Sequence, residues 1–511
     1  MRIVILDCGS QYTQLIRRVL DESGVATSVV DGDVFADELA ARYGTNGIAG
    51  VVISGGSGSI TGDYVQIDPA WLQLNIPMLG ICFGYQWLAQ KFGSTVSTTS
   101  HGFAGERLAV LRANQLISSS QDGTTVWMSH RDSVTSLGSE LVPIACTPES
   151  TVAAFQHESL AVYGVQFHPE VSHSDIGAEI LRAFAKICEV SMRPTPWSPE
   201  KFVDETIPQL RGAVGSDRVL LALSGGVDSS SLCALLARAM QPDQLLAVYI
   251  DSGLMQEETS KLTSELCKRL GVSYVEWDAA TRFFSALNVV KDPTEKCLVV
   301  GKIFASELTA VAQLHNCRFV AQGTIWSDVI ESGGTKFSSQ IKPHHNVAGM
   351  PEVLSFELLE PLRSLFKDQV RQLASHLGLP KEYSARRVFP GPGFAIRVKG
   401  LVTPKKVAVV RRASQIVEEV LDQQGLGPSI WMAFAVLLEV DSLGVQGDHR
   451  VENRWALVVR IVESTNSMTA RFSRSAYGAL EEIASRLVHE TVVGRVVYDI
   501  TDKPPATIEW E

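Results

Sequence analysis

Cysteine pairs are absent from this sequence. Its 511 residues include eight cysteines, which are scattered along the chain with no Cys-x-x-Cys spacing. In a reducing compartment such cysteines are mostly free, buried and small apolar side chains. Apolar residues make up 45% of the chain, which is enough to build several cores without disulfides or structural metals. One of the eight, Cys82, has a setting that needs a different explanation.

Positive charge and long apolar runs are also scarce. The net charge of -11 argues against broad, non-specific binding of nucleic acid, which needs a basic surface, although a local basic pocket for one phosphate stays compatible with it. No run approaches the ~18 apolar residues of a membrane span. The first residues already follow a strand pattern and lack the apolar core and cleavage site of a signal peptide. We therefore expect a cytoplasmic protein that binds neither nucleic acid nor a membrane.

Strand and helix patterns predict three domains. Residues 1–190 alternate short apolar strands with helices, which is typical of an open α/β sheet. Residues 192–199 contain three prolines and predict an extended linker. A second α/β domain is expected at 197–386 and a small α+β domain at 387–511. The expected strands are residues 2–6, 50–53, 77–81, 125–128, 152–155, 162–166, 219–223, 245–250, 274–277, 319–322, 429–439, 456–462 and 495–500, with C-terminal helices at 405–424 and 477–490.

Cys82 lies between two glycines at the end of a predicted strand. The segment from Gly80 to Gly84 reads Gly-Ile-Cys-Phe-Gly and precedes a helical pattern. This spacing is typical of a nucleophile elbow, a sharp strand-to-helix turn that exposes the thiol at a helix N-terminus, where the thiolate is favoured. Backbone N–H groups at the turn, including that of Phe83, can stabilise an oxyanion.

A base for this nucleophile follows another predicted strand. The segment Phe-His-Pro-Glu provides His168 as the base and Glu170 to orient the imidazole. Taken singly, Gly-x-Cys-x-Gly is more often a tight turn around a buried cysteine, and His-Pro-Glu is more often a surface loop. Their occurrence together in one α/β domain predicts a catalytic site made of Cys82, His168 and Glu170.

A glycine-rich loop opens the second domain. It follows the predicted strand at 219–223 and begins a helix. Glycines let backbone N–H groups approach a phosphate, and the helix N-terminus adds a favourable dipole. The loop lacks the lysine of the Gly-x4-Gly-Lys-Ser/Thr motif, and Asp228 within it can bind Mg²⁺. The residues expected to hold ATP here are Ser224, Gly225, Gly226, Val227, Asp228, Ser229 and Ser230.

Further polar segments lie at the predicted carboxyl ends of neighbouring strands, where ligands of open α/β sheets gather. Asp251, Gly253 and Leu254 follow one strand, and Gly323 and Asp328 follow another, with Asp328 a second Mg²⁺ candidate. Residues 341–347 are polar and basic, which suits a mobile lid that brings Lys342 to the phosphates of ATP. The adjacent His344 and His345 could be metal ligands, but neighbouring side chains rarely converge on one ion, so we favour the lid.

The N-terminal motifs resemble those of class I glutamine amidotransferases, over residues 1–190. In that family the segment Ser54-Gly55-Gly56 supplies part of the oxyanion hole, which implies this role for Gly55 and Gly56. The resemblance also implies that Gln86, Ser129 and His130 contact the substrate glutamine. The sequence departs from the family at Ser57, where proline is usual, and at Arg131, where glycine is usual; neither change touches the three predicted catalytic residues.

The whole chain resembles GMP synthetases. The Ser-Gly-Gly-Val-Asp-Ser-Ser loop is similar to that of ATP pyrophosphatases of the adenine-nucleotide α-hydrolase-like fold. Residues 389–393, Gly447-Asp448 and the C-terminal segment from Lys503 complete the pattern in the same order: glutaminase, ATP pyrophosphatase, dimerisation domain. The resemblance implies adenylation of the C2 oxygen of xanthosine monophosphate (XMP) by ATP with Mg²⁺, and displacement of AMP by ammonia to give GMP. It also implies a homodimer. Ammonia must travel enclosed, because in neutral water it protonates.

On the acceptor side the match is uneven. By resemblance Lys503, Thr507, Ile508 and Glu509 bind the nucleotide, with Lys503 on its phosphate. Cys297 stands where the family usually has arginine, and Met432 stands where it usually has glutamine. The segment Arg386-Arg387-Val388-Phe389 replaces the usual Arg-His-Pro-Phe. Residues 444–452 lack the methionine, threonine and tyrosine that are usual there. These changes remove hydrogen-bonding groups.

Two interpretations of these departures stay open. The first is lineage drift, compensated by Lys296, Lys302 or Arg387, and we favour it because the C-terminal segment is intact. The second is a paralogue that amidates a different purine-like nucleotide. A non-catalytic sensor of glutamine or nucleotide is a third hypothesis, against which the complete motifs argue. An RNA-thiolating enzyme would need a cysteine cluster and a basic surface, and the sequence has neither feature.

Overall fold

The computed structural model divides the chain into two compact units, each of which is described here by itself. Unit 1 comprises residues 1–197 and unit 2 comprises residues 198–331 and 356–510. The described residues are 1–44, 47–56, 58–60, 62, 65–98, 103–171, 173–192, 197–331, 356–384, 386–446, 449–464, 470–503 and 505–510. The predicted linker at 192–199, the segment 341–347 with Lys342, and Gly447-Asp448 fall wholly or partly outside them.

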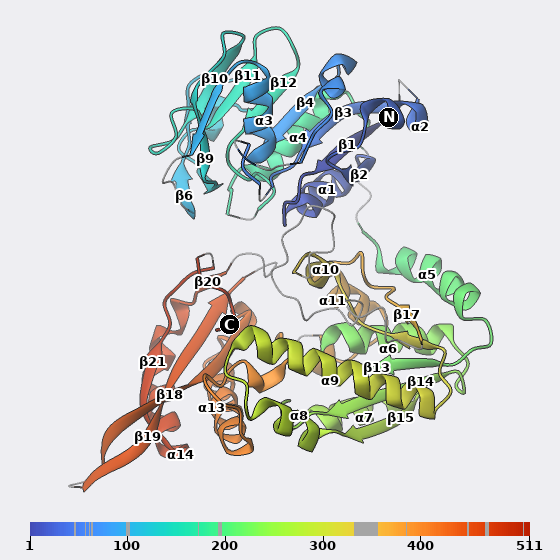
Figure 1. Ribbon diagram of the computed structural model, residues 1–511, viewed down its shortest axis with the longest axis vertical. Helices are drawn as coiled ribbons and strands as arrows, with labels where there is room; N and C mark the ends of the chain where they lie inside the picture. Colours follow the sequence, from blue (N-terminus) through green and yellow to red (C-terminus); the bar gives the residue numbers. More distant parts are fainter. Residues whose placement is uncertain are drawn as a thin grey trace. The chain divides into compact units, whose positions relative to one another are not determined.

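Unit 1 is built on one mixed sheet whose strand order is β2-β1-β3-β4-β12-β11-β10-β7. The strands β1 to β4 and β12 run parallel, whereas β11, β10 and β7 are added antiparallel. The parallel strands β1, β3, β4 and β12 are mostly apolar and are buried almost throughout, as strands covered by helices must be, whereas the edge strand β2 is only partly buried. The sheet elements are β1 (Arg2–Asp7), β2 (Thr27–Asp31), β3 (Ile48–Ile53), β4 (Met78–Ile81), β7 (Ala109–Val110), β10 (Leu141–Cys146), β11 (Ala154–His157) and β12 (Val162–Val165), with helices α1 (Thr13–Glu22), α2 (Ala36–Tyr43), α3 (Phe83–Lys91) and α4 (Gly177–Ile187) (Figure 1, blue to teal).

One strand predicted for the open sheet of unit 1 lies outside that sheet. Residues 125–128 do form a strand, β8 (Thr125–Ser129), but it pairs with β6 (Phe103–Arg107) in a separate two-stranded ladder and does not join the open sheet. A second small ladder joins β5 (Thr95–Thr98) to β9 (Asp132–Ser136). The sequence pattern of β8 gives its strand character but not its partner, because pairing is decided by tertiary contacts.

Unit 2 contains a parallel sheet with the order β15-β14-β13-β16-β17. The loop after β13 therefore emerges beside the loops after β14 and β16 at one edge of the sheet. The elements of this part are β13 (Val219–Ala222), β14 (Leu245–Asp251), β15 (Ser273–Asp278), β16 (Phe319–Ala321) and β17 (Glu357–Leu359), with helices α5 (Pro199–Val214), α6 (Val227–Ala239), α7 (Thr259–Leu270), α8 (Ala280–Leu287), α9 (Pro293–Leu314), α10 (Trp326–Glu331), α11 (Lys367–His376) and α12 (Lys381–Ser384).

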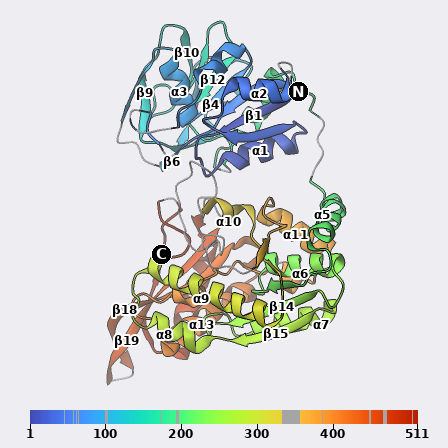
Figure 2. The same cartoon turned by 45° about the vertical axis from the view of Figure 1, so that its right-hand side comes forward.

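A mixed sheet, mostly antiparallel, forms the C-terminal part of unit 2. Two long strands, β18 (Met432–Gln446) and β19 (His449–Glu463), form a hairpin that β20 (Arg471–Phe472) and β21 (Val493–Tyr498) extend, and the helices α13 (Pro404–Gln423) and α14 (Leu480–Glu490) complete this part (Figures 1 and 2, orange to red). One apolar cluster runs from Leu220 and Val248 through α13 to Leu457 and Val459. The predicted boundary between residues 386 and 387 thus crosses a continuous core, and the three-domain division stays a prediction.

One helix, α9, is an exception to the expectation that no segment is long and apolar enough to span a membrane. Among the described residues, Pro293–Leu314 is long and apolar enough to cross a membrane by length and composition alone. A core helix passes the same test, and Val300, Leu308, Val311 and Ala312 of α9 are buried in the large core of unit 2. Figures 1 and 2 show it beside α8, against which it packs.

Candidate functional sites

Cys82 occupies the turn between β4 and α3, as the elbow motif predicts. Its φ of 50° lies in the left-handed region that non-glycine residues rarely adopt. A Cβ atom on Gly80 would lie 2.4 Å from the carbonyl oxygen of Gly84, and one on Gly84 would lie 2.3 Å from that of Ile53. Both glycines are therefore required by the close approach of backbone, and the strained turn holds the thiol at the carboxyl edge of the sheet.

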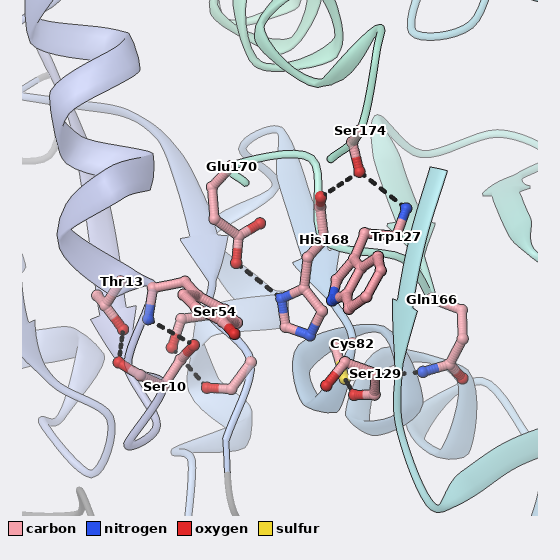
Figure 3. Close-up of polar contacts among 12 residues, drawn as sticks. Ser10, Thr13, Ser54, Cys82, Trp127, Ser129, Gln166, His168, Glu170 and Ser174 are labelled. Carbon is pink, nitrogen blue, oxygen red and sulfur yellow. Dashed lines mark hydrogen bonds and ion pairs between the residues drawn. The ribbon is translucent and has the colours of Figure 1, made fainter. Parts of the chain in front are cut away.

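His168 and Glu170 follow β12, the strand next to β4. Because β4 and β12 are parallel, the chain leaves both at the same edge of the sheet, which brings Cys82 and His168 together. The Nδ1 atom of His168 lies 2.8 Å from Oε1 of Glu170, and both side chains are buried (Figure 3). This pairing leaves Nε2 of the imidazole for the thiol, an arrangement suited to proton transfer during attack on a carbonyl.

The electrostatic setting of His168 favours the imidazolium ion. Burial lowers the pKa of His168, but the negative charges of Glu170 and Cys82, with hydrogen bonds to both, outweigh burial and raise it well above the usual value. The stabilisation gained from these charges is present while His168 is protonated, and it is lost as the pH rises through the raised pKa. The site therefore favours the protonated form of the His168 imidazole.

The predicted oxyanion segment lies against these residues. A Cβ on Gly55 would come 3.0 Å from Cε1 of His168, and one on Gly56 would come 2.6 Å from the carbonyl oxygen of Cys8. The backbone N–H of Gly84 donates to the carbonyl of Ser54 at 3.2 Å, which ties this segment to the turn that holds Phe83. Gly55 thus lets the backbone approach the imidazole, and Gly56 lets it approach Cys8; the role of both glycines in an oxyanion hole stays a prediction.

The other predicted glutamine contacts have partners within the protein. Gln86 is buried, and its Nε2 donates to the carbonyl of Asp132 at 2.7 Å. The carbonyl of Ser129 accepts from the Cys82 thiol at 3.5 Å, and Nδ1 of His130 lies 3.0 Å from the carbonyl of Asp132. Ser129 is therefore beside the nucleophile, whereas the amide of Gln86 serves the internal packing; glutamine binding by these residues stays a prediction.

Three supporting residues were missed by the sequence argument. Gln166 is fully buried, and its Nε2 lies 3.8 Å from the Cys82 sulfur. The hydroxyl of Ser174 donates to the carbonyl of His168 at 2.6 Å and accepts from the backbone N–H of Trp127 at 3.0 Å, while the N–H of His168 donates to the carbonyl of Trp127 at 3.0 Å (Figure 3). No spacing rule links Trp127 on β8 to the His-Pro-Glu segment, so only the fold could disclose that contact. Gln166 and Ser174 lie near His168 in the sequence, but their own residue types gave no signal of a role.

In unit 2 the glycine-rich loop joins β13 to α6, as predicted. Gly225 has a φ of 76°, which glycine adopts without strain. The hydroxyl of Ser229 accepts from the backbone N–H of Ser224 at 3.2 Å and donates to the carbonyl of Gly226 at 3.2 Å. A Cβ on Gly323 would lie 2.9 Å from the Ser229 nitrogen, so the loop after β16 packs directly on the first turn of α6. The remaining loop residues, Val227 and Ser230, are buried.

The residues predicted after β14 are buried or half-buried and are held by contacts within the protein. The carboxylate of Asp251 accepts from the N–H of Gly253 at 2.8 Å. Gly253 has a φ of 71°, and its carbonyl accepts from Arg411. Leu254 is buried, and its carbonyl accepts from the N–H of Phe394 at 2.8 Å, which anchors the Phe-Pro-Gly-Pro-Gly segment beside the loop.

Asp228 has the chemistry that a magnesium ligand needs. Its Oδ2 accepts from Nζ of Lys367 at 2.5 Å, while Oδ1 is buried and has no hydrogen-bond partner among the described residues. Asp328, the other candidate, accepts from the N–H of Ile325 at 2.9 Å at the start of α10. No cluster of three or more His, Cys, Asp or Glu side chains suited to a metal occurs in the described part of the chain, so a magnesium ion held here would also need phosphate oxygens and water as ligands.

Two basic residues at this loop were not predicted as ATP contacts. Lys367, at the start of α11, is mostly buried against Asp228. The guanidinium of Arg386 donates to the carbonyl of Gly225 at 2.9 Å and to the Thr259 hydroxyl at 3.2 Å. Both come from segments more than 125 residues away in sequence, so a motif-based search does not find them.

The C-terminal segment is held by two buried arginines. The carboxylate of Glu509 forms a bidentate pair with Arg397, at 2.8 and 3.1 Å, and both side chains are buried. Arg460 is fully buried and donates to the carbonyls of Thr507 and Ile508. Lys503 forms a backbone bridge with Ala470. Nucleotide binding by these tail residues stays a prediction, and the Glu509 carboxylate has a structural partner.

Two of the acceptor-side departures, Cys297 and Met432, are buried. Cys297 and Met432 are each at most 5% exposed, and the Met432 sulfur lies 3.9 Å from the Arg397 guanidinium. Lys296 donates to the carbonyl of Val398 at 2.6 Å, and burial first, then the charges of Lys399 and Lys406, lower its pKa to about 8. Arg387 is paired with Asp422. Lys296 is thus already used in the packing, which weighs against it as a replacement for an arginine at position 297.

Comparisons with known proteins agree with this arrangement. The family described as glutamine amidotransferase class-I matches residues 4–188, NAD synthase matches 201–305, and the GMP synthase C terminal domain matches 419–510. This order confirms the predicted fold class.

Curated relatives match over the entire chain. Proteins named glutamine-hydrolyzing GMP synthase from Campylobacter hominis, Nitratiruptor sp. and Parasynechococcus marenigrum are 41%, 44% and 42% identical over 516, 521 and 527 residues. The alignments cover 100% of this chain and 99%, 99% and 98% of the relatives. With this identity over its full length, the chain belongs to the glutamine-hydrolyzing GMP synthase family.

Proposed function

We propose that the protein converts XMP to GMP, with glutamine as the nitrogen donor and ATP as the activating reagent. Cys82 attacks the side-chain amide of glutamine, ammonia leaves, and water releases glutamate from the thioester. The C2 oxygen of XMP attacks the α-phosphorus of ATP and pyrophosphate leaves. Ammonia then attacks C2 and AMP leaves, carrying away the former C2 oxygen.

The proposed release of ammonia from glutamine rests on the buried arrangement of Cys82, His168 and Glu170. The 2.8 Å contact between His168 and Glu170 fixes the imidazole, and the raised pKa of His168 keeps it able to protonate departing ammonia. In this proposal the backbone N–H groups of Gly55, Gly56 and Phe83 would stabilise the oxyanion that forms on the attacked amide. A cysteine in such a strained elbow suits acyl transfer from an amide.

The proposed activation of XMP by ATP rests on the loop from Ser224 to Ser230. A glycine-rich turn at the N-terminus of α6 suits the polyphosphate of ATP. Lys367 and Arg386 add positive charge beside the loop, and Lys342 is a further proposed phosphate contact. The residues fit Mg²⁺, because Asp228 retains a buried oxygen without a partner; the ion, held by Asp228 and Asp328, would neutralise charge on the phosphates.

The acceptor nucleotide is proposed to bind beside the C-terminal segment, with Lys503 on its phosphate and Thr507, Ile508, Glu509 and Arg387 around it. Full-length similarity to GMP synthases supports XMP as the acceptor, and nothing in the comparisons supports a different purine-like nucleotide. We further propose a cytoplasmic homodimer. The exposed apolar side chains Val492, Val497 and Ile500, at and beside β21, are consistent with such pairing.

An acceptor screen tests this proposal. Purified protein with ATP, Mg²⁺ and ammonia is offered XMP, IMP, AMP and UMP in separate reactions, and AMP or pyrophosphate release is measured against a reaction without acceptor. We expect rapid turnover with XMP alone, because a site built to hydrogen-bond its acceptor rejects analogues by about 10⁴-fold or more. Turnover of another nucleotide without turnover of XMP would contradict the assignment and favour the paralogue.

A further inference from the structure

The loop between β1 and α1 contributes an aromatic side chain to the Cys82 site. The Tyr12 and His168 rings meet edge to face, with centroids 5.2 Å apart and planes at 77°. Such pairs contribute about 0.5–1.5 kcal/mol beyond their buried area and have a definite geometry. Tyr12 therefore gives the imidazole a ring contact in addition to its hydrogen bond with Glu170.

The backbone of this loop is held firmly in place. The buried carboxylate of Asp7 accepts from the N–H of Gly9 at 3.0 Å and from the hydroxyl of Thr13 at 2.8 Å. The hydroxyl of Ser10 accepts from the N–H of Tyr12 at 3.1 Å. The carbonyl of Tyr12 accepts the first hydrogen bonds of α1, so this residue begins the helix. Figure 3 shows Ser10 and Thr13 near Ser54, in the same region as His168 and Glu170.

The other contacts of His168 still allow its imidazole ring to tilt. The backbone of His168 is fixed by Trp127 and Ser174, and Glu170 holds Nδ1. A single hydrogen bond at Nδ1 still permits the ring to tilt about that contact, which would move Nε2 away from the thiol. Gly55 closes one side of the ring, since a Cβ there would lie 3.0 Å from Cε1. The Tyr12 ring supplies a further wall.

The phenol itself is a poor acid at this position. Burial, followed by the negative charges of Glu170 and Cys82, raises the pKa of Tyr12 to about 12. The hydroxyl therefore stays protonated at neutral pH and does not compete with His168 for the proton of the thiol. What Tyr12 provides is the shape of its ring beside the imidazole.

We propose that Tyr12 is a positioning residue for glutamine hydrolysis, whose ring fixes the tilt of the His168 imidazole toward Cys82. Truncation of the ring would let the imidazole tilt and admit water beside Glu170. Water would screen the charge of Glu170, so the pKa of His168 would fall toward its usual value. The inference rests on the proposed glutaminase role of Cys82 and His168.

The test compares Tyr12→Ala, Tyr12→Leu and Tyr12→Phe with wild type in the full chain. Glutamate release with XMP and ATP is measured as a function of pH, and ammonia-dependent GMP formation is measured in parallel. We expect Tyr12→Ala and Tyr12→Leu to lower kcat for glutamine by about 10- to 100-fold, the scale of a misplaced catalytic group, and to move the basic limb of the pH profile to lower pH. Tyr12→Phe, which keeps the ring, should restore both kcat and the profile.

Tyr43→Ala is the matched control, because Tyr43 packs on Arg2 at the amino end of β1, the opposite edge of the sheet. It should leave glutamate release unchanged. If Tyr12→Leu hydrolyses glutamine like wild type, or if Tyr12→Phe is as impaired as Tyr12→Leu, positioning by the ring is wrong. A lower kcat with an unmoved pH profile would also contradict it. Failure of the proposed function is distinguishable, since wild type itself would then release no glutamate.

Discussion

Replacing Cys82 with alanine is expected to abolish glutamine-dependent GMP formation and to spare formation from free ammonia. The nucleophile is lost, and removal of such a residue costs about 10⁴-fold or more in turnover. Glutamate release should disappear with it. Ammonia-dependent activity depends on the ATP loop of unit 2, and its residues are unchanged. The measurement is a pair of assays on one preparation, one with glutamine and one with an ammonium salt at alkaline pH.

Cys146→Ala provides the control for this experiment, because Cys146 lies on β10 of the same unit and is another free cysteine. It should leave both activities within about twofold, as expected of a substitution remote from a catalytic group. Loss of ammonia-dependent activity in a folded Cys82→Ala protein would show that the thiol serves the synthetase reaction as well, and the proposed division of labour would be wrong.

The second large effect is expected at Asp228. Asp228→Asn removes the negative charge while keeping the shape of the side chain, and pyrophosphate release from ATP should fall about 10³-fold with either nitrogen source, because charge on the transferring phosphoryl group loses its stabilisation. The substitution also leaves Lys367 without its ion-pair partner. A thermal unfolding midpoint measured on the same protein separates loss of catalysis from loss of folding.

Asp243→Asn makes the same change of charge at an exposed position before β14 and is expected to behave like wild type. Together the two variants separate a local role of the carboxylate from a general effect of net charge. Undiminished pyrophosphate release by Asp228→Asn would remove this residue from the proposed chemistry.

Local patterns were enough to predict much of the fold. The strands that carry the two sites begin or end within two residues of the predicted bounds, because apolar runs bounded by glycine or polar residues define them. The elbow glycines were predicted from the sharp turn, and the close approaches at Gly80 and Gly84 give the physical reason. The adjacency of β4 and β12, which joins Cys82 to His168 across 86 residues, follows from the sheet order and not from either segment alone.

Contacts between distant segments explain what the sequence did not disclose. The partner of β8, the pairing of Lys367 with Asp228, and the ring contact of Tyr12 with His168 all join residues with no fixed spacing. Charged residues in the acceptor region were expected to meet a nucleotide. Glu509 also meets Arg397 in a buried pair, which the motif of the tail cannot indicate because the arginine lies 112 residues earlier; nucleotide binding by Glu509 stays a prediction.

The most direct test of the account follows the nitrogen atom. Wild-type protein is incubated with XMP, ATP, Mg²⁺ and glutamine labelled with ¹⁵N in the side-chain amide, in a buffer that contains unlabelled ammonium. Mass spectrometry of the purine product should find GMP that carries the label, with AMP, pyrophosphate and glutamate formed in equal amounts. Formation of labelled ammonia and glutamate without labelled GMP would contradict the claim that the two sites act together to aminate XMP.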